Sequence, residues 1–341
     1  MKRYSTTKHN GFVLITVLLI IVLLTAVLLE FNYASRTNLR AADSFCHRQQ
    51  ALNCARAGLN IALAAIKHNP DLHTNDTLRH MLERPFVYQI AFGSCTLTLA
   101  SENGKLNVNL LKDGTGRLDR TRIDQLLRLI DLINHRLPNA ERIGYNIAPA
   151  IIDWTDADDQ VTILPFVTRA NAGAENSYYE NAPQPRLCGN HLLETIDELG
   201  LVRGIAPEIL HGSTVLNDRP DQPPRLSDYL TVYGDGKIDI NCAPPLFIQS
   251  LSEKMNPALA RMIVDRRKKK PFTDVSELQN IPGFPAAVYA AATRTLTVQP
   301  QARFFTVTAH GTVQQSSATI TAVIKRNSAS EKVDIILYKE Y

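Results

Sequence analysis

The chain has 341 residues, of which 45% are apolar and 21% are charged, and its formal net charge at pH 7 is +4. This length and apolar content are enough for one large or two medium folded domains. The moderate charge argues against a disordered chain and shows no strong bias toward nucleic acids. The 18 prolines and 16 glycines are spread along the chain, which excludes collagen-like and low-complexity classes.

The first informative segment is Phe12–Leu29, which contains no charged residue. Its length suffices for a membrane-spanning helix. Lys2, Arg3 and Lys8 precede it without an acidic residue. The positive-inside rule therefore predicts a cytoplasmic amino terminus and an external remainder. A secretory signal peptide would need a shorter apolar core and a small-x-small cleavage site, whereas residues 29–34 are bulky and polar. A plain signal anchor is the remaining alternative.

Gly11 and Phe12 add a detail, because a glycine separates a short basic leader from an apolar run that begins with Phe. This resembles the cleavage site of type IV prepilins and pseudopilins, where a membrane peptidase cuts after the glycine and methylates the new amino terminus. Most pilins carry Glu at the fifth residue after the cut, whereas this chain has Thr16. A carboxylate in lipid needs a partner, which pilins find in the neighbouring subunit. A subunit without it suits the tip of a filament.

The helix is expected to continue from Glu30 to Lys67, because this segment contains no proline. Apolar residues recur there at three- and four-residue steps. They are Leu52, Ala55, Leu59, Ala62, Leu63 and Ile66. Asn69 and Pro70 end the predicted helix. The alternative is a membrane helix followed by a separate soluble one.

Short apolar runs, several with alternation, predict an antiparallel sheet packed on the second half of this helix. These runs are residues 86–92, 96–100, 106–110, 304–309, 318–324 and 333–338. The stretch between them is expected to be helical and rich in loops. Its helix candidates are residues 123–137, 259–268 and 288–295. The predicted fold class is therefore α+β: a long amino-terminal helix on an antiparallel sheet, interrupted by a large, mostly helical insert.

Two internal echoes mark the insert. Residues 104–109 recur as residues 236–241, each a Gly-Lys turn entering a short strand, and the two strands are candidates to pair with each other. In addition, Asp274 is placed to cap a helix, and Pro282-Gly283 makes the turn to another. This resembles a helix-hairpin-helix unit, and residues 195–205 form a weaker second copy.

The order of these pieces resembles the minor pseudopilin K family of type II secretion systems. Besides the leader, the resemblance rests on residues 153–158, 172–179, 198–204 and 238–244. It implies a prepilin leader at residues 1–11, a transmembrane helix at 12–30, a pilin-like domain at 31–110 and 300–341, and an inserted helical domain at 111–299. The chain differs from the family pattern at Cys242, where Thr is usual, and at Asn176, where Asp is usual.

The resemblance also implies a function and a location. Members of the family join minor pseudopilins I and J, and through them other pseudopilin subunits, at the tip of a periplasmic pseudopilus. They are held in the inner membrane by a single helix and processed by prepilin peptidase. The tip primes and caps the pseudopilus, which exports folded exoproteins across the outer membrane. The alternative in the same class is a pilin-like component of a DNA-uptake system.

The acidic segment that contains Asp153, Asp156 and Asp158 is a candidate calcium site, together with Glu175 and Asn176. Ca²⁺ takes six to eight oxygen ligands, often from irregular loops. Clustered carboxylates repel one another unless a cation lies among them. The resemblance adds that the insert of this family binds Ca²⁺ as a structural cofactor. The alternative is a solvated acidic turn.

The five cysteines show no zinc-binding spacing. Cys46 and Cys54 are too far apart on one helix to bridge each other. This leaves one disulfide among Cys95, Cys188 and Cys242, with buried free thiols as the alternative.

Enzymatic and DNA-binding functions have little support. No nucleophile elbow, zinc-protease motif or phosphate loop is present. A helix-hairpin-helix unit binds DNA phosphates through backbone amides, and Pro285 removes one of these amides two residues after Gly283. We therefore expect neither catalysis nor nucleic-acid binding.

Overall fold

The computed structural model describes residues 10–69, 76–90, 93–138, 142–212, 224–300, 302–328 and 332–341. The helices are α1 (Asn10–His68), α2 (Asp76–Glu83), α3 (Arg120–Asn134), α4 (Ile147–Thr155), α5 (Asn176–Tyr179), α6 (Pro207–His211), α7 (Pro245–Ser250), α8 (Pro257–Lys269) and α9 (Ala286–Thr295). The strands are β1 (Phe86–Ile90), β2 (Gly93–Ser101), β3 (Leu106–Asn107), β4 (Leu230–Thr231), β5 (Ile238–Asp239), β6 (Leu296–Thr297), β7 (Ala302–Val313), β8 (Ser316–Asn327) and β9 (Val333–Glu340).

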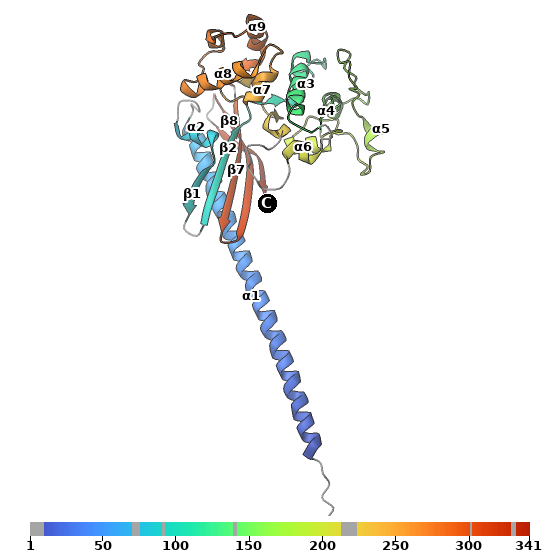
Figure 1. The fold of residues 1–341 in the computed structure, drawn as a ribbon, viewed down its shortest axis with the longest axis vertical. Helices are drawn as coiled ribbons and strands as arrows, with labels where there is room; N and C mark the ends of the chain where they lie inside the picture. Colours follow the sequence, from blue (N-terminus) through green and yellow to red (C-terminus); the bar gives the residue numbers. More distant parts are fainter. Residues whose placement is uncertain are drawn as a thin grey trace, which may run out of the picture.

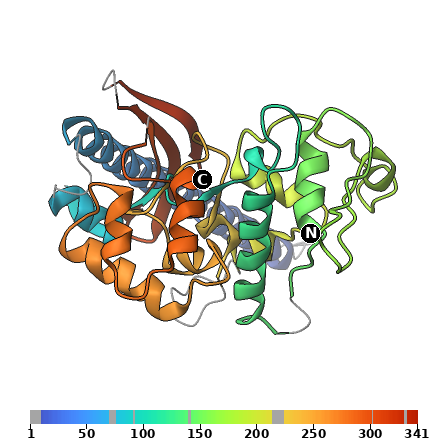
Figure 2. The same ribbon diagram turned by 90° about the horizontal axis from the view of Figure 1, so that it is seen from above.

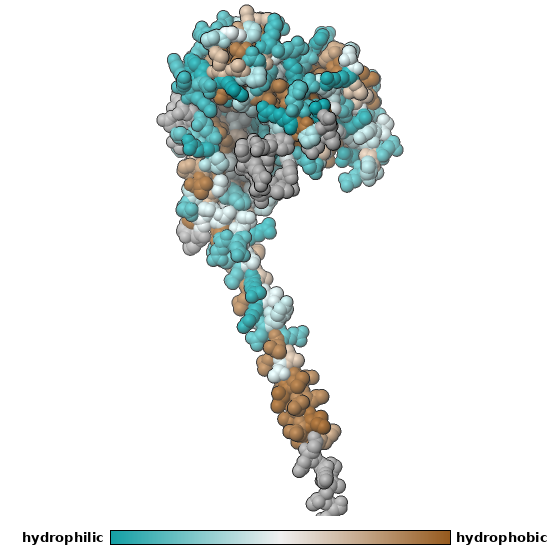
Figure 3. Space-filling view, viewed as in Figure 1, coloured by the Kyte–Doolittle hydropathy of each residue, from teal (hydrophilic) through white to brown (hydrophobic). Residues whose placement is uncertain are grey.

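Helix α1 is one continuous stem, which confirms the predicted long helix (Figure 1). Every residue of Phe12–Leu29 is exposed, and this apolar stretch forms the free lower end of the stem (Figure 3). The helix is long and apolar enough to cross a membrane, with a mean hydropathy of 3.3 in its most apolar window. It is therefore compatible with a single-pass membrane anchor.

The upper half of α1 packs on a five-stranded sheet with the order β1-β2-β7-β8-β9. Every neighbouring pair in this sheet is antiparallel, as the alternating runs predicted. Residues that alternate along the strands bury one face against the helix, among them Leu97, Val307 and Ile320. They meet Leu59 and Ile66 of α1. Burying each such side chain stabilises the fold by about 1.5–3 kcal/mol.

Gly311 lets the sheet come close to the stem. A Cβ atom at this position would lie 2.0 Å from the carbonyl oxygen of Ala51 and 2.8 Å from the amide nitrogen of Ala55. The backbone of β7 thus rests directly on the backbone of α1. No larger residue fits here unless the helix moves away from the sheet.

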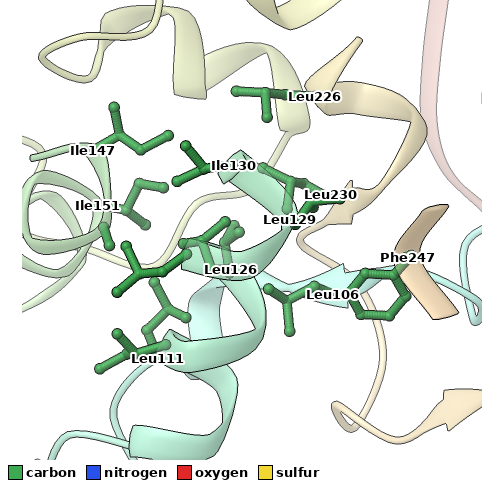
Figure 4. Packing of buried hydrophobic residues seen from close by; sticks show 14 of the residues in the cluster. Leu106, Leu111, Leu126, Leu129, Ile130, Ile147, Ile151, Leu226, Leu230 and Phe247 are labelled. Carbon is green, nitrogen blue, oxygen red and sulfur yellow. The ribbon is translucent and has the colours of Figure 1, made fainter. Parts of the chain in front are cut away.

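The helical insert has its own core, which lies at the end of the sheet away from the free end of the stem (Figures 1 and 2). Leu126, Leu129 and Ile130 of α3 point from the middle of this core toward α4 and the chain around Leu230 (Figure 4). Phe247 of α7 closes one side. Helices α8 and α9 contain two of the helix candidates, and α3 overlaps the third, beginning and ending three residues earlier than expected.

The insert differs from expectation at its edges. The run 106–110 is a strand over only Leu106–Asn107, followed by a 3₁₀ turn. Leu106 and Val108 belong to the core of the insert, so the helical part begins a few residues before 111. The pairing considered between the two echoed strands was wrong, because β3 pairs with β4 and β5 pairs with β6, both parallel.

The chain passes from the sheet into the insert through Glu102 and Asn103, both buried. The Asn103 amide donates to the carbonyl of Ala302 at 2.9 Å and its oxygen accepts from the Phe304 N–H at 2.7 Å. The Asn103 carbonyl accepts from the N–H of Asp239 at 2.7 Å. One residue therefore ties β7 of the sheet to β5 of the insert.

Replacing Gly311 with Ala should lower the free energy of unfolding by about 2–3 kcal/mol, since the new methyl overlaps helix backbone rather than a side chain that can rotate. The measurement is urea unfolding of the full chain in detergent micelles, followed by circular dichroism. Gly114→Ala is the matched control: no atom lies within 4 Å of its Cβ position, so its effect should stay within about 0.5 kcal/mol. Equal effects of the two changes would contradict the close-approach argument.

Candidate cation-binding site

Helix α4 presents Asp153 to the interior. Eight of its nine residues are buried, from Ile147 to Trp154, and Asp153 has no exposed surface. The helix ends at Thr155, and the backbone of the next residue, Asp156, is extended. The following chain therefore turns away and carries Asp158 back toward the same side. Local helix geometry thus places the first acid inside and the next two at the mouth of the site.

A second segment brings Glu175 to these acids. An isolated bridge between Ile163 and Ala172 closes the intervening loop, and the Gly173 N–H donates to the carbonyl of Thr162 at 3.0 Å. A Cβ atom at Gly173 would lie 2.1 Å from Oδ2 of Asp153, so only glycine lets the chain pass this close. Glu175 follows two residues later and is 1% exposed.

The structure gathers three of the predicted ligands at one point. One carboxylate oxygen each from Asp156, Asp158 and Glu175 lies within 4.8 Å of the other two. Four buried oxygens have no hydrogen-bond partner: Oδ2 of Asp153, Oδ1 of Asp156 and both Oε atoms of Glu175. Leaving one buried polar group unsatisfied costs about 1–3 kcal/mol, and more when it is charged.

The pKa values of the acids in the cluster are raised. Burial, then repulsion from Asp153, Asp156 and Asp159, raises the pKa of Glu175 to about 7. Burial also raises the pKa of Asp153. The pKa of Asp156 is raised by burial, although its ion pair with Lys112 works in the opposite direction. In the absence of a cation, these carboxylates therefore disfavour one another's charge.

These residues fit a hard divalent cation such as Ca²⁺. The four unpaired oxygens are ligands of the type that Ca²⁺ prefers, and a cation among them would remove both the desolvation cost and the repulsion. The remaining ligands of a six- to eight-coordinate ion would come from Asp158, carbonyls and water.

Asn176 has a different place from the other four candidates. Its side-chain oxygen accepts from the N–H of Cys188 at 2.8 Å, and its amide donates to Asp159 at 3.2 Å. It therefore links the two loops beside the cluster. Sequence analysis also missed Lys112, which lies far from the acids in sequence; no local signal identifies it as the partner of Asp156.

The cysteines are all described and none forms a disulfide in the structure. Cys95 is buried in the core of the sheet, whereas Cys188 is buried in the core of the insert, so these two do not meet. Cys242 lies near the junction and donates to Asp239. The structure thus has free thiols in place of the expected disulfide, buried at Cys95 and Cys188 and half-buried at Cys242.

The amino-terminal residues bear on processing. Residues 1–9 of the leader lie outside the described residues, and the helix already includes Gly11 and Phe12. The hydroxyl of Thr16 donates to the carbonyl of Phe12 at 2.9 Å. Because this bond satisfies the hydroxyl within the helix, Thr16 needs no partner from another chain. Cleavage after Gly11 stays a prediction.

Both helix-hairpin-helix-like units use the same local device. Asp274 with Glu277, and Thr195 with Glu198, each form a capping box at the start of a 3₁₀ helix, so Asp274 caps a helix as expected. Each unit then turns at a glycine with positive φ, +79° at Gly283 and +85° at Gly204. The second unit is therefore a true structural repeat of the first.

Comparisons with known proteins agree with this architecture. A sequence profile described as "Type II secretion system (T2SS), protein K" matches residues 104–212. A second profile, "Helix-hairpin-helix motif", matches residues 235–297. The chain is 22% identical over 306 residues to type II secretion system protein K of Aeromonas hydrophila, covering 83% of this chain and 86% of the relative. It is 24% identical over 277 residues to the protein of the same name from Pseudomonas aeruginosa, covering 77% and 74%.

A solved structure has the same fold. It is a chain in the crystal structure of the GspK-GspI-GspJ complex from the type 2 secretion system of enterotoxigenic Escherichia coli. The TM-score is 0.63 at 18% sequence identity, and the match covers 89% of this chain and 99% of that chain.

Replacing Glu175 with Gln should separate the charge of the site from its packing. In chelator the variant should be at least as stable as the parent chain, because the change removes repulsion without breaking a hydrogen bond that Glu175 makes. At a calcium concentration of about 100 times the dissociation constant, the parent should gain about 2.7 kcal/mol and the variant much less. Thermal unfolding of the full chain with and without Ca²⁺ measures both.

Glu180→Gln is the matched control, since this exposed acid ends the same segment and should leave the calcium response unchanged. A loss of stability in chelator on replacing Glu175 would mean that its carboxylate stabilises the fold without a cation. An unfolding temperature of the parent chain that does not change with Ca²⁺ would exclude a calcium site here.

Proposed function

Because the chain belongs to the type II secretion system protein K family, and is thus a minor pseudopilin, we propose that it initiates and caps the pseudopilus. In this role it stands at the tip of the filament and takes part in the export of folded exoproteins across the outer membrane. The family is a structural component of a secretion machine, so no catalytic step is assigned to the chain.

The position of the helical insert is the observation that carries this proposal. Its helices lie beyond the end of the sheet opposite the free stem, which is where the next subunit of a filament would have to sit (Figure 1). The insert has its own buried core and is fixed to the sheet through Asn103. A bulky, rigid body at that end supports a subunit that begins a filament and does not continue one.

Thr16 supports the same position. A glutamate there would have to find a partner within the membrane, because an unpaired charge in a bilayer costs about 2.5–3.5 kcal/mol or more. The Thr16 hydroxyl is hydrogen-bonded within its own helix and needs no partner from another subunit. The chain thus lacks the usual attraction to a subunit above it.

The proposal includes partners, processing and location. Protein K in the E. coli structure is part of a complex with GspI and GspJ. By analogy, we assign minor pseudopilins I and J as the partners of this chain, and prepilin peptidase as the enzyme that cleaves after Gly11 and methylates Phe12. Three basic leader residues support an amino terminus in the cytoplasm, with the folded part in the periplasm.

We also assign Ca²⁺ to the acidic cluster as a structural cofactor. Asp153, Asp156, Asp158 and Glu175 would hold the ion, which would supply positive charge and fix the loops on either side of it. These loops contain few regular elements besides α5, a single turn of helix. A bound ion would therefore stabilise the part of the insert that has the least hydrogen-bonded secondary structure.

A DNA-uptake role has weaker support, although the helix-hairpin-helix profile matches. The Phe284 N–H, first after Gly283, is bonded to the carbonyl of Ile281 at 3.0 Å. Pro285 has no N–H. Two of the amides that would bind phosphate in such a hairpin are thus unavailable.

Deleting the gene in the organism that encodes the chain should abolish the release of type II exoproteins and leave DNA uptake unchanged. The measurements are exoprotein activity in medium against periplasm, and transformation frequency. Loss of transformation with normal secretion would favour the DNA-uptake role and overturn the proposal. Complementation with the parent gene controls for effects on neighbouring genes.

Thr16→Glu should shift the chain from the tip into the shaft and reduce secretion, because the new carboxylate seeks the amino terminus of a neighbouring subunit. Cross-linking to the major pseudopilin should rise relative to cross-linking to I and J. Thr16→Ser keeps the hydroxyl and is the control. Unchanged cross-linking and secretion would show that residue 16 does not determine position.

A further inference from the structure

The two edges of the five-stranded sheet differ in how they are protected. At one edge, β9 contains Asp334, Lys339 and Glu340. Glu340 pairs with Arg56 of α1 at 3.0 Å, and Lys339 pairs with Asp197 of the insert. The pairing of β9 with β8 is also interrupted by a register shift between Val323 and Ile324. Charges, bulges and covering segments are the usual means of preventing further strands from adding to a sheet.

The other edge, strand β1, has no charged residue, bulge or proline in its own sequence. Strand β1 reads Phe-Val-Tyr-Gln-Ile, without charge or proline, and pairs with β2 in unbroken register from Phe86↔Leu97 to Ile90↔Gly93. The side chains of Phe86 and Val87 are 44% and 58% exposed. An uncharged, apolar edge strand of this kind is a template for another strand.

The register identifies which backbone groups are free. Opposite residues of an antiparallel pair alternate between those that exchange hydrogen bonds and those that do not. The Glu102 N–H donates to the carbonyl of Phe304 at 2.9 Å, so every second residue of β2 back to Ser94 bonds to β7, and Gly93 bonds to Ile90 of β1 instead. Phe86 and Tyr88 therefore also bond to β2, whereas Val87 and Gln89 turn their N–H and C=O groups outward.

We propose that β1 is a docking edge to which an extended, uncharged segment of a neighbouring minor pseudopilin adds as a sixth strand. This inference rests on the proposed function for the identity of the partner. The free backbone groups of Val87 and Gln89 require an extended chain, and the uncharged surface of β1 matches an uncharged segment.

The place of the edge favours a neighbouring pseudopilin as the occupant. A Cβ atom at Gly58 of α1 would lie 2.6 Å from the hydroxyl of Tyr88, so the side chain of Tyr88 reaches from β1 to the stem. Strand β1 lies on the stem side of the insert (Figure 1). A subunit whose own stem packs against this one in the membrane would carry its folded domain to the same height and side.

Gln89→Pro tests the edge without disturbing the sheet. It removes one outward N–H and places a ring where the new strand would lie, but it breaks no bond to β2. Gln89→Ala alters the same side chain and keeps the N–H. Both full-length variants, with the parent, are titrated in detergent micelles against the purified complex of minor pseudopilins I and J. Gln89→Pro should weaken binding about tenfold, and Gln89→Ala less than about twofold, with unchanged melting temperatures for both.

Hydrogen exchange on the parent chain gives an independent readout. The amides of Val87 and Gln89 should exchange fast in the free chain and become protected in the complex. Equal binding by the two variants, or no protection at these amides, would overturn the docking edge while the assignment of I and J as partners stood. Protection that grows with chain concentration in the absence of I and J would identify a second copy as the occupant and would also overturn it. A parent chain that does not bind I and J at all would defeat the proposed function itself.

Discussion

The whole structure depends on the way in which the chain leaves the sheet at Glu102 and Asn103. Both residues are buried, and both side chains have partners: the Glu102 carboxylate accepts from Lys105 and Thr306, while Asn103 bonds to Ala302 and Phe304. Because the Asn103 carbonyl also bonds to Asp239, the insert cannot pivot on a flexible linker. The proposed capping role needs an insert that is rigid relative to the stem, and this junction provides buried hydrogen bonds that are costly to break.

The buried carboxylates at the junction differ from those of the acidic cluster in their hydrogen bonding. Glu102 and Asp239 are buried carboxylates, and both are satisfied; Asp239 faces Arg303 at 3.6 Å. Asp153 and Glu175 are buried to the same degree, yet three of their four carboxylate oxygens have no partner. A fold that satisfies its acids at the junction but not at the cluster has a specific requirement there. The proposed bound cation would meet this requirement, since one positive ion would satisfy every orphaned oxygen at once.

The sequence predicted what local periodicity determines. The stem followed from an unbroken run without proline, and the strands from alternation, because one face of each element must be buried. It did not predict the pairings of β3 and β5, since two-residue strands carry no periodicity and their partners are chosen by the surrounding core. The acids of the candidate cation site were singled out because most of them are close in sequence and because the family resemblance implies a calcium site there. Lys112 was missed, because the sequence around neither residue indicates that it pairs with Asp156 in the fold.

The two ends of the molecule and the two edges of its sheet differ in how much uncharged or apolar surface they expose. At the upper end, the insert has a separate core around Leu126, Leu129 and Ile130 of α3. At the lower end, the apolar residues of α1 are wholly exposed and need lipid or other helices to cover them. On the sides, one sheet edge is charged and tied to the insert, whereas the other is neutral. The exposed apolar stem and the neutral edge are thus surfaces open to neighbours below and on one side, which agrees with the proposed place at the tip.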